Sequence, residues 1–183
     1  MAGLDAVRDA LPDWARDVKL NLQAVMGDGA LTTAQRWGVA VASAATSRNP
    51  RLLAAIVADA RREVDAAVVD DALAAAALMA MSNVYYRFRH MVGKPEYTGK
   101  PLRLRMNRLA RPASSKTDLD LYSLAASAIN GCEVCVQAHE KAVVEGGLTE
   151  DHVNDTVRIA ATVHAAAVAL EAAGIETAAA AAA

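Results

Sequence analysis

Ala72-Leu-Ala-Ala-Ala-Ala-Leu-Met-Ala-Met81 is the stretch of this chain that indicates its fold most directly. Alanine is the strongest helix former, and Leu73, Ala77 and Met81 recur at the spacing of one helical face. Alanine dominates the apolar residues elsewhere too, and runs of Val, Ile and Tyr, typical of strands, are scarce. The sequence therefore predicts an all-α protein made of closely packed helices.

Turn-forming residues divide the chain into further predicted helices. Gly27-Asp-Gly29, Asn49-Pro50, Asn130-Gly131 and Gly146-Gly147 mark the breaks. We expect helices over residues 4–11, 13–26, 34–47, 51–64, 72–90, 102–110, 117–129, 132–145 and 150–173. A short link is expected over 65–71 and a loop over 93–101, and the Ala-rich tail 178–183 is expected to be frayed.

A degenerate internal repeat is visible at an offset of 84 residues. Ala40-Val-Ala-Ser-Ala-Ala-Thr-Ser-Arg48 aligns with Leu124-Ala-Ala-Ser-Ala-Ile-Asn-Gly-Cys132. This predicts one domain over residues 1–177, with a first repeat over 1–85 and a second, carrying the cysteines, over 102–175.

Composition limits the classes of function. The 183 residues are enough for one domain, and 54% apolar with 22% charged residues is typical of a soluble globule. A net charge of −2 and only 4% aromatic residues argue against nucleic acid as a partner. No signal peptide and no apolar run of about 18 residues is seen, so we expect no membrane span and a cytoplasmic protein. Two cysteines in that compartment are more typical of reactive or metal-binding groups than of a structural disulfide.

The chemistry is concentrated in Cys132-Glu-Val-Cys135 and His139. On a helix the two thiols and the imidazole share one face, and Cys132, directly after Asn130-Gly131, is expected at a helix N-terminus that favours a thiolate. His139 can accept a thiol proton. Asp120 lies on the preceding predicted helix and could orient His139 if that helix packs back.

Other interpretations of the cysteines remain open at this point. They could be two buried, inert thiols. They could bind zinc with His139 and a fourth ligand from Asp120, His152 or His164, although no second Cys-x-x-Cys is present. Thioredoxin also uses this spacing, but its fold requires βαβ units that this sequence does not predict.

One region is strongly basic. Residues 87–116 contain nine Lys or Arg and a single acid, Glu96. Such a region is either solvated surface, a subunit contact or a docking site for an acidic protein, and in the last case Arg103, Arg105 and Arg108 are the candidate contacts.

These residues together resemble the alkyl hydroperoxidase D family, within the carboxymuconolactone decarboxylase-like superfamily. The resemblance rests on Asp120, Ser127-Ala-Ile-Asn-Gly-Cys-Glu-Val-Cys135 and His139, and extends to about residue 177. Further stretches resemble it too: Leu11-Pro-Asp-Trp-Ala-Arg-Asp-Val-Lys-Leu-Asn-Leu22, Ser43-Ala-Ala-Thr-Ser-Arg-Asn-Pro50, Met81-Ser-Asn-Val-Tyr-Tyr-Arg87 and Leu104-Arg-Met-Asn107.

The resemblance implies an all-α homotrimer that reduces alkyl hydroperoxides through a dithiol–disulfide cycle, with no bound metal or cofactor. It implies dihydrolipoamide, carried by a lipoylated 2-oxoacid dehydrogenase component, as the electron donor, and a peroxiredoxin, alkyl hydroperoxide reductase C, as a partner. Cys135 matches the peroxidatic thiol, Cys132 the resolving thiol and proton donor, and His139 with Asp120 the proton relay.

Two residues depart from the pattern of one well-known family member, which carries Glu at the position of Asp120 and His at the position of Val134. Three other functions compete with the peroxidase. The first is an adaptor reductase that passes electrons from a lipoylated protein to a peroxiredoxin. The second is a lactone-acid decarboxylase, which does not need two cysteines. The third is a zinc-stabilised helical module.

Overall fold

The computed structural model describes residues 2–181, and the side chains of residues 2–175. Every regular element within residues 2–181 is a helix, which confirms the all-α prediction. In chain order the elements are α1 (Ala2–Ala10), the 3-10 turn η1 (Asp13–Ala15), α2 (Arg16–Ala24), α3 (Thr33–Ser47), α4 (Pro50–Glu63), α5 (Ala66–Val92), α6 (Pro95–Thr98), α7 (Asn107–Ala110), α8 (Lys116–Ile129), α9 (Glu133–Glu145) and α10 (Glu150–Ala181).

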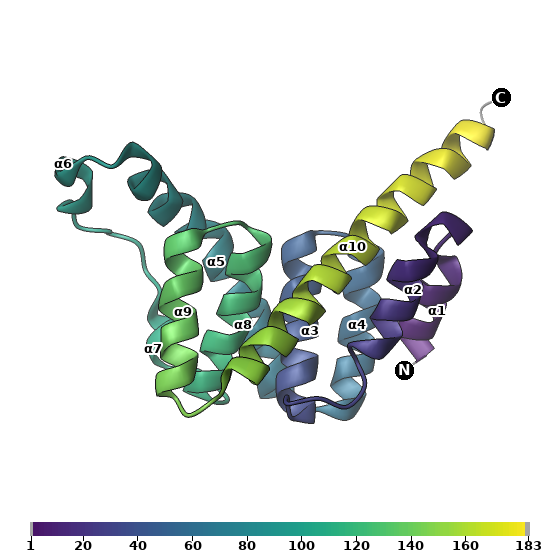
Figure 1. Ribbon diagram of the computed structural model, residues 1–183, viewed down its shortest axis with the longest axis horizontal. Coiled ribbons are helices and arrows are strands. Elements are labelled where there is room, and N and C mark those ends of the chain that lie inside the picture. Colours follow the sequence, from purple (N-terminus) through teal and green to yellow (C-terminus); the bar gives the residue numbers. More distant parts are fainter. Residues whose placement is uncertain (1, 182–183) are drawn as a thin grey trace.

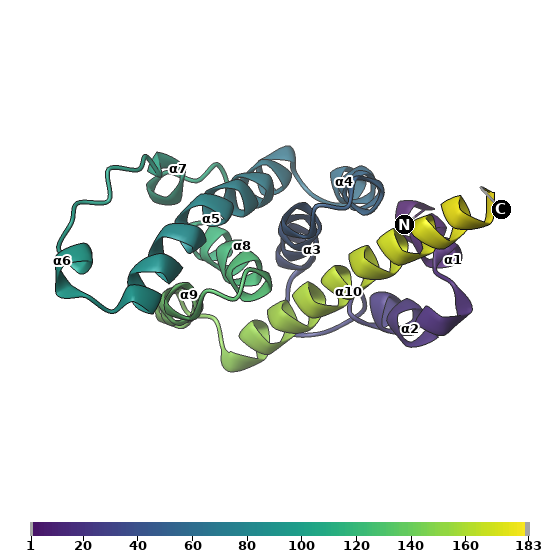
Figure 2. The same cartoon turned by 90° about the horizontal axis from the view of Figure 1, so that it is seen from above.

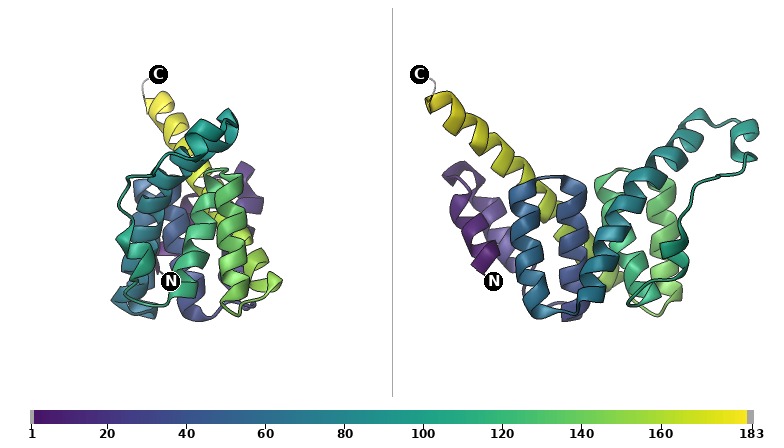
Figure 3. Two further views of the ribbon diagram at one scale, coloured as in Figure 1. Left: turned by 90° about the vertical axis from the view of Figure 1, so that its left-hand side faces the viewer. Right: turned by 180° about the vertical axis from the view of Figure 1, so that it is seen from behind.

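A central pair of helices organises the fold. Helices α3 and α8 pack against each other, α5 covers one side of the pair, and α10 crosses the other side (Figures 1 and 2). Helix α4 lies beside α3, and α9 lies beside α8. The C-terminal end of α5 projects beyond the bundle and carries the single turn α6 (Figure 3). Cys132 and Cys135, at the start of α9, therefore lie in the part of the bundle where α5, α8 and α9 contact one another.

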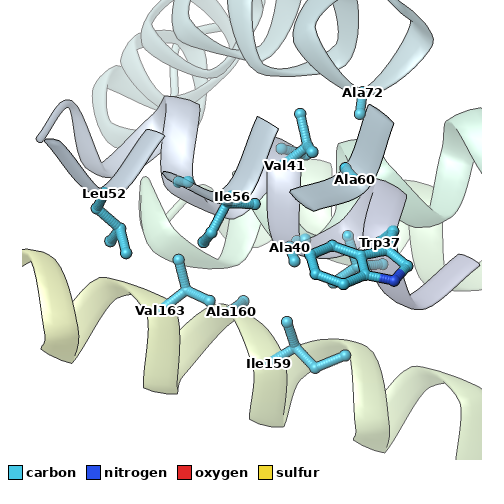
Figure 4. Close-up of a cluster of buried hydrophobic side chains, with 14 of the residues drawn as sticks. Trp37, Ala40, Val41, Leu52, Ile56, Ala60, Ala72, Ile159, Ala160 and Val163 are labelled. Atoms are coloured by element: carbon cyan, nitrogen blue, oxygen red, sulfur yellow. The ribbon is translucent and has the colours of Figure 1, made fainter. Parts of the chain in front are cut away.

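The core is built on α3, which is buried over most of its length. Its Trp37 and Ala40 meet Ile56 of α4 and Ile159 and Val163 of α10 (Figure 4). These side chains are at most 4% exposed. Because so many core positions are alanine, the helix backbones can approach closely, as the composition indicates.

Helices α3 and α8 approach each other closely where Gly38 of α3 faces Tyr122 of α8. A Cβ atom on Gly38 would overlap the Tyr122 ring. The ring is fully buried, and its hydroxyl donates a hydrogen bond to the carbonyl of Ala34 at 3.4 Å. Burial raises the pKa of the Tyr122 phenol, helped by the charges of Asp118 and Asp71, so it remains a neutral packing group.

The helix order also bears on the predicted repeat. Helices α8, α9 and α10 begin 83, 83 and 84 residues after α3, α4 and α5. Helices α5 and α10, the third members of these triplets, each contact both α3 and α8. The duplication and its boundaries remain a proposal, and this spacing supports it.

Four sequence expectations about helix limits are wrong. The loop expected over 93–101 contains the helical turn α6, which begins at Pro95, a residue with a φ suited to the first turn of a helix. Of the helix expected over 102–110, only Asn107–Ala110 is helical, and residues 101–106 have no regular structure. Leu102, Leu104 and Met106 are half-buried and alternate with exposed neighbours, which is a period of two residues and not the period of a helix. The link expected over 65–71 is instead the start of α5, with Asp65 as the N-cap residue. Val68 and Val69 in this stretch are buried, so core packing extends the helix toward its N-terminus. Helix α10 continues to Ala181, so 178–181 is helical, and residues 182–183 of the expected tail lie outside the described residues.

Two long helices bear on the expected absence of a membrane span. By length and composition alone, Ala66–Val92 and Glu150–Ile175 could each cross a membrane. Core helices of soluble proteins pass the same test, and both of these pack on the central pair. The absence of a membrane span stays a prediction.

We predict that Gly38→Ala destabilises the protein by about 1–3 kcal/mol or more, because the added methyl group overlaps a ring that is packed on all sides. Urea unfolding followed by circular dichroism measures this. Gly174→Ala in α10 is the matched control: it has open space around the added Cβ and should be neutral or stabilising by about 0.5–1 kcal/mol. Equal stability of Gly38→Ala and wild type would contradict the close approach.

Candidate active site

A tight turn between α8 and α9 sets the position of the first cysteine. Helix α8 ends at Ile129, and Gly131 takes a left-handed φ of 65° that glycine adopts without strain. The amide of Cys132 then donates back to the carbonyl of Ser127 at 3.1 Å. Cys132 is consequently the N-cap residue of α9.

Cys132 and Cys135 form a disulfide across the first turn of α9, with their Cα atoms 5.3 Å apart. Both residues are buried, with Cys132 0% and Cys135 6% exposed. When the disulfide is reduced, the unpaired N–H groups at the start of α9 favour the thiolate form of a sulfur held there. The geometry is therefore that of a dithiol able to cycle between two oxidation states.

His139 and Asp120 meet beside the disulfide. Nδ1 of His139 on α9 lies 3.2 Å from Oδ1 of Asp120 on α8. The second carboxylate oxygen, Oδ2, accepts a hydrogen bond from Lys116, one turn earlier on α8. A carboxylate held in this way fixes the orientation of an imidazole whose second nitrogen remains available for proton transfer.

The Asp120 carboxyl stays ionised despite being nearly buried. Burial alone would raise its pKa, but the hydrogen bonds from His139 and Lys116 and their positive charges outweigh that effect, so the pKa lies below its ordinary value. Lys116 is a partner of Asp120 that was not predicted from the sequence. Its spacing of four residues from Asp120 on a helix could have indicated the pair.

A cavity of about 430 Å³, called here the thiol cavity, opens onto Cys135 and His139. A volume of this size is typical of small-molecule sites. Its wall is mainly apolar. The remaining lining residues are Met79, Ser82 and Tyr86 of α5, Val134 and Ala138 of α9, and Met106 and Leu109 of the segment between α6 and α8.

The segment that supplies Met106 and Leu109 is tied down by one buried carboxylate. Asp71 of α5 accepts hydrogen bonds from Nε of Arg108 at 2.6 Å, from the amide of Ala113 at 3.1 Å and from the amide and hydroxyl of Ser114. Burial would raise the pKa of Asp71, but these hydrogen bonds, led by that of Ser114, hold it below its ordinary value. Asp71 thus positions one wall of the thiol cavity.

A polar network on α5 supports the turn before Cys132. Asn83, which is 1% exposed, donates to the Ser127 hydroxyl at 3.1 Å and accepts from the Asn130 side chain at 2.9 Å. Arg87 donates to the Asn130 carbonyl. In the sequence Asn130 indicates only a helix break, and nothing local indicates Asn83 or Arg87, because their partners are more than 40 residues away along the chain.

The thiol cavity is not lined by His90, His152 or His164. His90 lies in the last turn of α5, 3.4 Å from Glu133, the residue that follows Cys132. His152 contacts Thr149 at the start of α10, and His164, which is exposed, lies 3.1 Å from the Ser47 hydroxyl. Among the side chains described, no three His, Cys, Asp or Glu residues are grouped to hold a metal ion.

The candidate docking arginines differ in their surroundings. Arg103 and Arg105 are exposed on the segment that leads to Met106. Arg108 is engaged by buried Asp71, so its charge also serves the fold.

Comparison with known proteins agrees with this geometry. The carboxymuconolactone decarboxylase family matches residues 95–180. The chain is 72% identical to alkyl hydroperoxide reductase AhpD of Anaeromyxobacter dehalogenans (strain 2CP-C), over 95% of this chain and 94% of the relative. The chain belongs to the AhpD family. Less similar AhpD proteins match over nearly their full length too. The AhpD protein of Rhodospirillum centenum is 45% identical over 92% of this chain and 91% of the relative. The AhpD protein of Brucella suis is 44% identical over 94% of this chain and 99% of the relative.

We predict that Asp71→Asn destabilises this AhpD family member by about 2 kcal/mol at pH 7, because hydrogen bonds to a charged acceptor are lost. Since folding lowers the pKa of Asp71, its contribution is complete above the unfolded-state pKa and is lost as the pH falls through the lower folded-state pKa. The difference between variant and wild type, measured by urea unfolding, should therefore shrink below about pH 4.

Asp70→Asn is the matched control for this prediction. Asp70 is the exposed neighbour of Asp71 on the same helix, so its replacement should change stability by no more than about 0.5 kcal/mol. A destabilisation that stays the same down to pH 2 would contradict the role given to the Asp71 charge.

Proposed function

We propose that the chain is a thiol peroxidase that reduces alkyl hydroperoxides. The observation that carries this proposal is the thiol cavity: an apolar wall leads to Cys135 and His139, and His139 is held by Asp120. An alkyl group can pack against Met79, Met106 and Leu109 while its hydroperoxide reaches the sulfur. The AhpD relatives are named alkyl hydroperoxide reductases, which agrees with a peroxide-related oxidoreductase.

The reaction begins with proton transfer. His139, oriented by Asp120, takes the proton of Cys135, and the thiolate attacks the terminal peroxide oxygen. The O–O bond breaks, an alcohol leaves with a proton from the Cys132 side, and Cys135 becomes a sulfenic acid. Cys132 attacks that sulfur, releasing water and forming the disulfide. Two electrons have then passed from the two thiols to the peroxide.

Re-reduction requires an external dithiol. We propose dihydrolipoamide, carried by a lipoylated 2-oxoacid dehydrogenase component, which reopens the disulfide by thiol exchange. A peroxiredoxin of the alkyl hydroperoxide reductase C type is the proposed second partner, a trimer the proposed assembly, and the cytoplasm, where reductants keep thiols reduced, the proposed location. The donor, the peroxiredoxin and the trimer rest on the family resemblance, and the location rests on the expected absence of a signal peptide and of a membrane span.

The first test is NADH consumption with lipoamide, lipoamide dehydrogenase and an alkyl hydroperoxide. We expect wild type to turn over and Cys135→Ser to lose roughly 10³-fold or more, because the nucleophile is removed. Gln137→Ala, an exposed change on the same helix, should retain activity. If wild type fails alone but turns over when the peroxiredoxin is added, the adaptor function replaces the peroxidase.

The proton relay is tested in the same assay. Asp120→Asn should lower the rate of the peroxide reaction by about 10²-fold or more, whereas Asp120→Glu, the residue of another family member, should largely restore it. Restoration by Glu separates a charge that orients His139 from a merely structural role. Equal losses in both variants would count against the relay.

The docking proposal concerns Arg103 and Arg105, the exposed arginines on the segment that leads to Met106. We expect Arg103→Glu with Arg105→Glu to weaken use of a lipoylated protein domain by roughly tenfold, because rim charges steer association, while free dihydrolipoamide is used as before. KM for each donor measures the difference. Equal losses with both donors would contradict docking at this segment.

A further inference from the structure

The two sulfurs of the disulfide are not equally reachable. Cys132 is 0% exposed, whereas Cys135 is 6% exposed and lines the thiol cavity. In thiol–disulfide exchange the rate depends on which sulfur the incoming thiolate can approach. Access therefore favours attack on Cys135.

Leaving-group chemistry favours the same sulfur. Attack on Cys135 breaks the S–S bond and expels Cys132 as a thiolate. Cys132 is the N-cap residue of α9, where the helix dipole and unpaired N–H groups stabilise negative charge, and a stabilised thiolate leaves faster. Access and leaving-group stability therefore both favour attack on Cys135.

The larger neighbouring cavity does not offer the reductant a route to either sulfur. This arm cavity, of about 680 Å³, lies between the end of α5 and the α6 region, and its lining includes Arg89, His90 and Thr98. Tyr86 and Val134 line both cavities and so stand between them, and neither cysteine is among the residues that line the arm cavity.

Building on the proposed function, we infer that the dithiol reductant enters the thiol cavity, the same one that admits the peroxide, and forms its mixed disulfide with Cys135. The first reductant thiolate bonds to the Cys135 sulfur, and Cys132 leaves with both electrons of the old S–S bond and then takes up a proton. The second reductant thiolate attacks the first reductant sulfur, forming a cyclic disulfide and releasing Cys135 as a thiolate beside His139. The reductant is oxidised by two electrons and the protein disulfide is reduced by two.

One cavity for both substrates has a consequence for the reductant. The peroxide reacts with the reduced cysteines and the dithiol reacts with the disulfide, so the two substrates use the cavity in turn. The reductant must also deliver its thiol past Met106, Ala138 and Tyr86, which suits a dithiol at the end of a thin, unbranched chain better than a thiol on a folded protein surface.

The site of the mixed disulfide can be mapped on the wild-type protein. The oxidised protein is treated briefly with 2-mercaptoethanol, quenched with acid, alkylated with iodoacetamide and fragmented by tandem mass spectrometry. We expect the mercaptoethanol adduct on Cys135 and the alkyl group on Cys132. The reverse assignment overturns the inference. This experiment involves no peroxide, so it decides the inference even if the peroxidase proposal fails.

Variants then test the shared cavity. Ala138→Leu narrows the thiol cavity and should slow both the single-turnover reaction with cumene hydroperoxide and the reduction of the disulfide by dihydrolipoamide, each by about tenfold or more. Thr98→Leu in the arm cavity and Gln137→Leu, which lines neither cavity, should leave both rates within about twofold. Reduction slowed by Thr98→Leu, or left unchanged by Ala138→Leu, overturns the inference.

Discussion

The close approach of α3 and α8 is the constraint on which the rest of the structure depends. Gly38 provides the space that the Tyr122 ring occupies, and this lets two nearly buried helices form a central pair. Helix α8 carries Asp120 and leads directly into the turn that ends at Cys132. The scaffold that fixes the two cysteines is therefore fixed by close packing of α3 against α8, at a point two residues along α8 from Asp120.

Two buried carboxylates then convert this scaffold into a site. Both Asp71 and Asp120 remain ionised because their hydrogen-bond donors outweigh the cost of burial, and their pKa values are lowered for the same reason. Asp71 holds a stretch of backbone and so positions a cavity wall, whereas Asp120 holds the His139 imidazole and so fixes the orientation of its ring. A charge can be buried at such places because each oxygen atom has a partner.

The sequence predicted well what depends on local chemistry. Alanine content, turn residues and the spacing of Cys132, Cys135 and His139 indicated the helices and the shared face of α9. It predicted poorly what depends on distant partners. The segment 101–106 has helix-forming residues yet has no regular structure, with Arg103 at a left-handed φ of 51°. Asp71 anchors the stretch that follows it, and nothing near residue 102 in the chain indicates that distant anchor. The Asn83–Asn130 pair was not predicted either, because the two residues are far apart along the chain.

The turn before Cys132 connects these observations. Asn83 and Arg87 bind it from α5, Ser127 binds it from α8, and the same stretch of α5 supplies Ser82 and Tyr86 to the thiol cavity. A shift of α5 relative to α8 would therefore change the position of the sulfur and the shape of the cavity together. One face of α5 therefore holds the turn that carries Cys132, and the adjacent face shapes the cavity onto which Cys135 opens. Neighbouring residues of α5 can serve these two purposes because the helix period places them on different faces of the helix.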